Sequence, residues 1–172
     1  MLRVALSEVR AGPVDTTGEV APDDPILAAA EWSLASPLRV RGRFSGAGEG
    51  KYYWRVHFDT TARLECRRCL AAVELPVSES RGLIFTADDE TPEGEGCYAI
   101  PPRATMVDLT GALREELLLA VPLFVECRPE CRGLCPRCGA NLNDGPCSCT
   151  TPADPRWDAL RSLPQADTPK KD

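Results

Sequence analysis

The nine cysteines of this 172-residue chain are the residues whose types and spacing most clearly suggest chemistry. Eight of them fall into four close pairs: Cys66 and Cys69 in CRRC, Cys127 and Cys131 in CRPEC, Cys135 and Cys138 in CPRC, and Cys147 and Cys149 in CSC. A short turn between two cysteines lets both thiolates reach one metal ion, and four thiolates complete the tetrahedron that zinc prefers. The sequence therefore predicts two four-cysteine metal sites.

The distances in sequence between the four pairs favour one grouping of these cysteines. The four C-terminal cysteines are close enough in sequence to form one compact site, called site 2: Cys135, Cys138, Cys147 and Cys149. The other four then form site 1, which joins distant parts of the chain: Cys66, Cys69, Cys127 and Cys131. A competing assignment joins CRRC to CPRC in one ribbon-like site and leaves the other pairs free or in a second site. Spacing alone does not decide between the two.

Zinc, two ions per chain, is the predicted cofactor, and an iron–sulfur cluster is the alternative because four thiolates also hold such clusters. A thiol redox protein or sensor would need CxxC at the start of a helix in a βαβ unit. Here a strand-like segment, LAAVELPV, follows CRRC, and a loop rich in glycine and asparagine follows CPRC. Four thiolates leave zinc no open position, and the sequence shows no other catalytic motif. We therefore expect no enzyme and no small-molecule substrate.

The charge of the chain limits its partners. It carries 26 acidic and 20 basic residues, a net charge of −6, so it should not attract nucleic acid without specificity. Four arginines adjoin the cysteine pairs and are candidate contacts to RNA or to a partner protein: Arg67, Arg68, Arg132 and Arg137. Arginine suits phosphate recognition, although codon bias with solvated arginines explains the same excess. No helix-turn-helix or basic helix suggests a DNA-binding regulator.

The cellular location is expected to be cytoplasmic, with no membrane partner. The chain contains no run of 18 apolar residues that could span a bilayer, and MLRVALSEVR lacks the apolar core of a signal peptide. Reduced thiols in that compartment also favour metal binding over disulfides.

The elements that position the cysteines are expected to be mainly strands. Apolar residues alternate with polar ones over 37–44, and then again from Trp54 to Cys66 as one long strand or two strands with a bend. Further strands are expected over 72–77 and 81–86. An apolar stripe over 109–121, with Asp108 as N-cap and Pro122 beyond the end, predicts a helix. The fold class is therefore α+β: an antiparallel β-rich body with one main helix and a C-terminal zinc-knuckle segment.

Four parts are expected along the chain. They are a loosely structured N-terminal segment over 1–35, a β-rich body over 36–126 with its main helix at 108–121, a cysteine-rich zinc-knuckle segment over 127–150, and a short helix and tail over 151–172. An acidic loop over 88–96 interrupts the body. His57 lies on the polar face of its strand and is expected to be solvated. Cys97, far from the other cysteines, is expected to be a lone thiol.

The ordered motifs resemble the YceD family of large ribosomal RNA subunit accumulation proteins. The resemblance rests on CRRCL, DLTGALREELLLAVPL, CRPECRGLCPRCGANLN, CSC and DPRWDALRSL, and it runs from about Pro37 to Leu163. It implies a non-enzymatic factor that supports accumulation of large-subunit (23S) ribosomal RNA and ribosome assembly. The implied partners are ribosomal RNA or a large-subunit ribosomal protein, and an acidic chain would suit a basic ribosomal protein. A thiol redox role for the CxxC pairs is the alternative function.

Overall fold

A computed structural model describes residues 2–27, 30–48, 50–87, 96–150 and 156. The chain divides into two compact units, Met1–Cys131 and Arg132–Asp172. The four-part division expected from the sequence stays a prediction. None of the described helices is long and apolar enough to cross a membrane.

A mostly antiparallel sheet dominates the first unit. In the described part of the chain its main path runs β2 (Val14–Val20), β4 (Leu38–Gly48), β5 (Lys51–Glu65), β6 (Ala72–Thr86) and β7 (Cys97–Ala99). The short β3 (Ser33–Leu34) also pairs with β5, and β7 runs parallel to its neighbour β6. A separate ribbon joins β1 (Arg3–Ala5) to β8 (Met106–Asp108).

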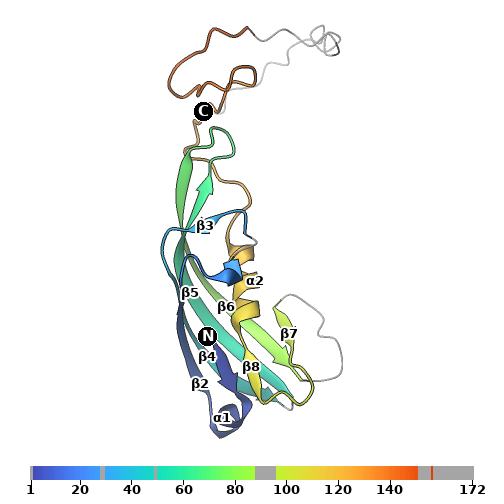
Figure 1. The fold of residues 1–172 in the computed structure, drawn as a ribbon. Coiled ribbons are helices and arrows are strands. Elements are labelled where there is room, and N and C mark those ends of the chain that lie inside the picture. The colour runs from blue at the N-terminus through green and yellow to red at the C-terminus, as the bar shows by residue number, and fades with distance from the viewer. Residues whose placement is uncertain (1, 28–29, 49, 88–95, 151–155, 157–172) are drawn as a thin grey trace, which may run out of the picture. The chain divides into compact units, whose positions relative to one another are not determined.

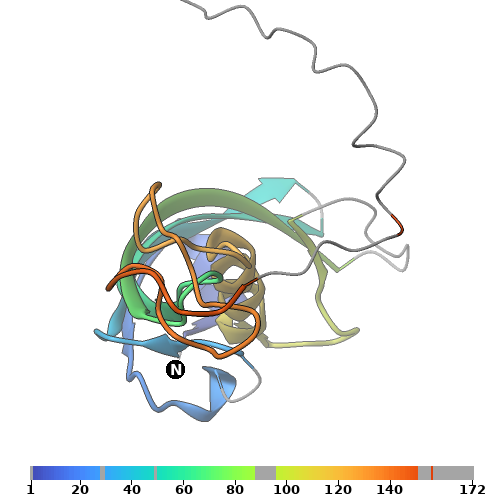
Figure 2. The same ribbon diagram turned by 90° about the horizontal axis from the view of Figure 1, so that it is seen from above.

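The main helix, α2 (Thr110–Ala120), lies along one face of this sheet (Figure 1), and the sheet curves around it (Figure 2). Two short helices complete the described elements: α1 (Leu6–Ala11) and the 3-10 helix η1 (Pro25–Leu27). The core fills the space between the sheet and α2, because both contribute fully buried apolar side chains such as Phe58, Leu113 and Leu117. This burial is the main source of the unit's stability.

The alternation predicted for the long strand is confirmed. The even-numbered residues from Trp54 to Cys66 are buried, whereas the odd-numbered ones are half-buried or exposed. Trp54 is fully buried, and its indole nitrogen donates a hydrogen bond of 2.9 Å to Thr16. The strand is continuous, so the alternative with a bend is wrong, and the two strands expected over 72–86 are one. Pairing of β5 with β6 along their whole length keeps both extended.

The N-terminal segment, expected to be loosely structured, differs from that description. It begins with β1, which is followed directly by α1. It also contains β2, which pairs with β4 residue by residue. That pairing depends on a partner far along the chain, so local composition did not reveal it. Residues 88–95 of the expected acidic loop, and all but residue 156 of the short helix and tail expected over 151–172, lie outside the described residues.

The α+β class and the single main helix are confirmed. Helix α2 begins after Leu109, and the carboxylate of Asp108 accepts a hydrogen bond of 3.0 Å from the Thr110 amide. Asp108 therefore supplies the predicted capping interaction from one position earlier. Glu116 of α2 is buried although it is charged. It accepts hydrogen bonds from Arg81 and Tyr98, which compensate for the removal of its charge from water.

Candidate metal centre

The CRRC motif forms the turn between the two longest strands. Glu65 of β5 pairs with Ala72 of β6, so the six residues between them close this hairpin. Within the turn the Cys66 amide donates to the Ala71 carbonyl, and the Leu70 amide donates to the Cys66 carbonyl. Cys66 is fully buried and Cys69 is nearly so. The longest hairpin of the sheet therefore holds two thiols in one fixed position.

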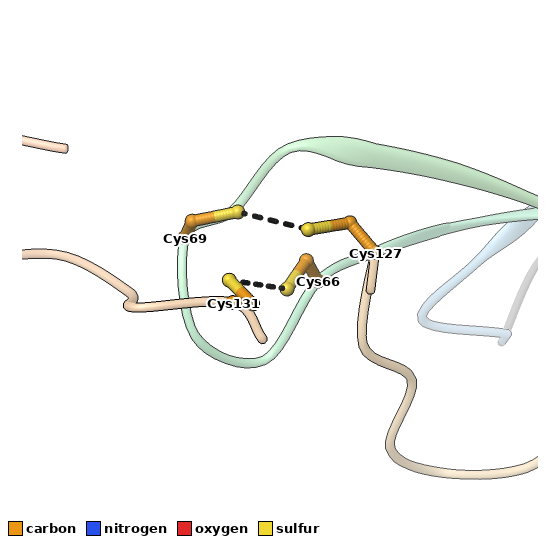
Figure 3. Close-up of side chains that lie close together, drawn as sticks. All are labelled: Cys66, Cys69, Cys127 and Cys131. Carbon is orange, nitrogen blue, oxygen red and sulfur yellow. Dashed lines mark hydrogen bonds between the residues drawn. The ribbon is translucent and has the colours of Figure 1, made fainter. Parts of the chain in front are cut away.

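The segment after α2 carries the other two thiols of site 1 to this turn. Val125 forms a parallel bridge with Cys66, and its carbonyl accepts a hydrogen bond of 2.9 Å from the Arg67 amide. Cys127 and Cys131 follow that bridge and face the turn (Figure 3). Site 1 therefore joins the end of the hairpin to a segment 58 residues further along the chain.

The sulfur positions in site 1 suit one tetrahedral ion. The Cys66 and Cys131 sulfurs lie 3.8 Å apart, and the Cys69 and Cys127 sulfurs lie 3.6 Å apart (Figure 3). All four lie within 4.8 Å of one another. A zinc–sulfur bond of about 2.3 Å in a regular tetrahedron implies neighbouring sulfurs about 3.8 Å apart. A disulfide would need about 2 Å, and all these cysteines are free.

Site 2 repeats the same turn on a different scaffold. The Cys135 amide donates to the Ala140 carbonyl, and the Gly139 amide donates to the Cys135 carbonyl. The residue after the second cysteine has a positive φ in both turns, 59° at Leu70 and 71° at Gly139. Cys147 and Cys149 complete the set, with all four sulfurs within 4.8 Å of one another. The two CxxC turns thus share one backbone conformation, in which glycine fits and leucine is strained.

Backbone amides lower the pKa of the first thiol in each turn. In site 1 the amide of Cys127 is the main reason that the pKa of Cys66 falls to about 6, with further amides from Arg68 and Cys69 and an opposing effect of burial. In site 2 the amides of Arg137 and Cys138 lower the pKa of Cys135 to about 6. Amides that point at sulfur favour thiolate over thiol. Both turns are therefore prepared to hold a thiolate, the form that binds metal.

A second layer of charged contacts surrounds site 1. The Glu126 carboxylate, one residue before Cys127, lies 2.6 Å from Arg67 and 3.2 Å from Arg68. Arg68 also donates a hydrogen bond of 2.9 Å to the Cys131 carbonyl. These contacts link the CRRC turn directly to the CRPEC segment. The role of Glu126 was not predicted from the sequence. Its position directly before Cys127, a predicted metal ligand, was the signal that could have indicated it.

The structure brings the eight paired cysteines together as site 1 and site 2, the grouping that their distance along the sequence favours. The competing site that joins CRRC to CPRC is not observed among these residues. Four arginines are predicted to contact RNA or a partner. Two of them, Arg67 and Arg68, form ion pairs with Glu126 beside site 1. In the second unit the Arg132 amide donates to Asn143, and the Arg137 side chain donates to the Thr150 carbonyl. Cys97 belongs to neither group and lies half-buried in β7. His57 is half-exposed and contacts Ser80.

Comparisons with known proteins place these features in a family. Residues 54–164 match the family described as large ribosomal RNA subunit accumulation protein YceD. An uncharacterized protein of Mycobacterium tuberculosis is 34% identical over 110 residues, which cover 60% of this chain and 52% of that protein. The chain thus spans about half the length of the first curated relatives it matches.

Two plant proteins extend the comparison. The large ribosomal RNA subunit accumulation protein YCED homolog 1, chloroplastic, of Arabidopsis thaliana is 32% identical, with 52% of this chain and 37% of that protein covered. The protein of the same name in Zea mays is 28% identical over 80% of this chain and 53% of its own length. No solved structure matches significantly. Because the family match covers well over half of the chain, including the main helix and all eight cysteines of the two groups, the protein belongs to the YceD family.

Proposed function

We propose that this protein is a non-enzymatic, zinc-stabilised factor that supports accumulation of large-subunit ribosomal RNA and ribosome assembly in the cytoplasm. The observation that carries the proposal is the family match, which spans the β5–β6 hairpin, α2 and both cysteine groups. The plant relatives are named for accumulation of large ribosomal subunit RNA. The partner would be that RNA or a protein of the same subunit.

Zinc is the proposed metal because the donor set and its spacing suit one small ion. Each site offers four sulfurs within 4.8 Å of one another, and neither group includes an oxygen donor from the residues that the structure describes. In a four-iron cluster each thiolate binds a different iron, so its cysteine sulfurs lie farther apart than around a single ion. Four-thiolate zinc is closed to further ligands and acts structurally. It would hold the hairpin turn against the segment after α2, and it would order the second unit.

A redox role for the CxxC pairs has less support from the fold. Catalytic CxxC motifs use the start of a helix to activate the first thiol. CRRC lies instead in a strand–strand turn, and its first cysteine is fully buried. If the thiols hold zinc, iodoacetamide should modify chiefly Cys97 in the native protein and all nine cysteines after chelation and unfolding. Rapid alkylation of Cys66 or Cys69 in native protein would favour the redox alternative.

Contacts of Arg67, Arg68, Arg132 and Arg137 with RNA or a partner stay a prediction. The first two are already engaged with Glu126, so we expect their removal to weaken site 1 as well as any external contact. A test through these arginines would therefore mix the two effects. The cysteines outside and inside the sites give a cleaner comparison.

The experiment is depletion of this protein in its own host, followed by rescue. Large-subunit RNA, measured relative to small-subunit RNA, should fall on depletion and recover with the wild-type chain. A Cys66→Ser/Cys69→Ser variant should fail to restore it, whereas Cys97→Ser, a control outside both sites, should succeed. An unchanged RNA ratio on depletion would contradict the proposed function. Full rescue by the double variant would contradict the need for site 1.

A further inference from the structure

The face of the sheet opposite α2 carries an open depression of about 610 Å³. It lies over the middle of β4, β5 and β6, where odd-numbered residues of β4 and β5 point away from the core. Its polar side chains include Arg41, Arg43, Arg55, His57 and Ser80. The α2 side of the same strands is filled by the apolar core. The side chains of this outer face therefore take no part in packing the core.

The depression is basic although the chain as a whole is acidic. Four arginines line it, whereas no Asp or Glu does, and the net charge of the chain is −6. One of the four, Arg81, is paired with Glu79 and Glu116. Two further carboxylates pair with other lining side chains: Asp15 lies 3.1 Å from Arg43, and Asp59 lies 4.0 Å from His57. In the described part of the chain, no ion pair joins Arg41 or Arg55 to a carboxylate.

The register of β4 and β5 places two like charges directly opposite each other, because Arg43 faces Arg55. Arg41 faces His57 in the same register. Like-charged cross-strand neighbours destabilise a sheet, and an opposite charge at either position would have stabilised it. Departures of this kind from local stability are expected at functional surfaces. The arrangement would become favourable with an anion bound across the two strands.

An aromatic side chain borders the same depression. Tyr53 lies over Gly82 of β6, where a Cβ atom would collide with the tyrosine ring. Glycine at this position therefore leaves room for the ring on the open face of the sheet. Next to it the Ser80 hydroxyl lies 3.1 Å from a ring nitrogen of His57. Tyr53 is half-buried, and arginines around such a partly accessible ring combine phosphate contacts with a surface on which a base can stack.

We propose that this outer face, centred on Arg41, Arg55 and Tyr53, binds the sugar–phosphate backbone and a stacked base of RNA. The proposal rests on the proposed function, because it names the surface through which such a factor would contact ribosomal RNA. RNA is favoured over an acidic protein segment because both the planar guanidinium groups and the aromatic ring match a nucleotide. The surface lies on strands and does not include the arginines beside the cysteine turns.

The test compares two double variants of the full-length, metal-loaded protein. Arg41→Gln/Arg55→Gln removes two arginines from the depression. Arg39→Gln/Arg63→Gln removes the same charge from exposed positions of the same two strands, where the arginines pair with Glu19 and Glu74. Binding of a short fluorescent single-stranded RNA and of an RNA hairpin is measured by anisotropy between about 50 and 200 mM salt. Circular dichroism and metal content verify that both variants are folded.

The first variant should bind single-stranded RNA roughly tenfold more weakly, and the slope of log affinity against log salt should fall by about 1.4. The second variant should change both quantities much less. Tyr53→Leu should weaken binding of the single strand roughly tenfold without changing the salt slope, because stacking carries no charge. These results would support the proposal.

Equal binding by the two double variants would overturn it. So would a wild-type protein that binds neither RNA probe, even if depletion lowers large-subunit RNA in the cell. In that case the proposed function would stand through a protein partner. Loss of binding to an acidic peptide but not to RNA in the first variant would also overturn it and would identify the surface as a protein contact.

Discussion

The two cysteine sites use the same turn in opposite structural settings. In site 1 the CRRC turn closes the longest hairpin of a sheet that has its own core, and its partner cysteines come from beyond α2. In site 2 all ligands lie between Cys135 and Cys149, and the described part of the second unit buries little besides Gly133 and Cys135. Metal in site 1 would cross-link a fold that already exists. Metal in site 2 would itself be the core of a fold.

Loss of site 1 should have the largest effect on the first unit. Cys69 and Cys127 are 58 residues apart, and a cross-link closing a loop of that size contributes about 4 kcal/mol by chain entropy. Cys66→Ser/Cys69→Ser should therefore lower the free energy of unfolding of the sheet by about that amount in urea denaturation. Cys97→Ser is the control and should change it far less. Equal losses from both variants would remove the distinction between ligand and ordinary thiol.

Glu126→Gln should weaken metal binding at site 1 without removing a ligand. It deletes the carboxylate charge that holds Arg67 and Arg68 beside the CRRC turn. Outer contacts of this kind commonly change metal affinity by about tenfold or more. Competition with a chromophoric chelator should show one zinc ion per chain released more readily and the other unchanged. Release of both ions together would contradict independent sites.

The shared turn conformation provides a matched pair of substitutions. Leu70 and Gly139 both have a positive φ, which costs a residue with a Cβ atom about 1 kcal/mol. Leu70 is mostly exposed, so Leu70→Gly should stabilise the first unit slightly in thermal unfolding. Gly139→Ala should instead weaken zinc binding at site 2 by a few fold. The expected result is a gain in stability from Leu70→Gly and a loss of zinc affinity from Gly139→Ala. A loss of stability from Leu70→Gly as well would show that the two turns are not equivalent.

Loss of site 2 should affect the first unit least. Cys147→Ser/Cys149→Ser should leave the unfolding free energy of the sheet within about 0.5 kcal/mol, because no ligand of site 2 belongs to that unit. Hydrogen exchange of residues 132–150 should rise at the same time, because the metal would be their main source of order. Unchanged protection of these residues would contradict the assignment of site 2 as a metal-ordered fold.

The elements that follow a local period could be predicted from the sequence. The alternation from Trp54 to Leu64 and the apolar stripe of α2 each identify one buried face, and both are observed. These two features depend mainly on neighbours in sequence, so a local pattern was sufficient. Spacing favoured the observed grouping of the cysteines but did not decide it, because site 1 joins residues 58 positions apart.

Features that depend on distant partners were missed. Strand β2 lies in a segment whose composition resembles a loop, and it is extended because β4 pairs with it. Glu116 is buried because Arg81 and Tyr98 satisfy its carboxylate. Leu70 adopts a conformation that its own side chain disfavours, because the hairpin turn requires it. None of these follows from local propensity, since each is determined by tertiary contacts.

Metal content per chain tests the central claim most directly. Protein purified without added metal should contain about two zinc ions by elemental analysis, and the Cys147→Ser/Cys149→Ser variant should contain about one. That pair of values would establish two independent four-thiolate sites. Iron in place of zinc, or wild-type protein without metal, would contradict the account and make electron-transfer or thiol chemistry the explanation of the eight paired cysteines.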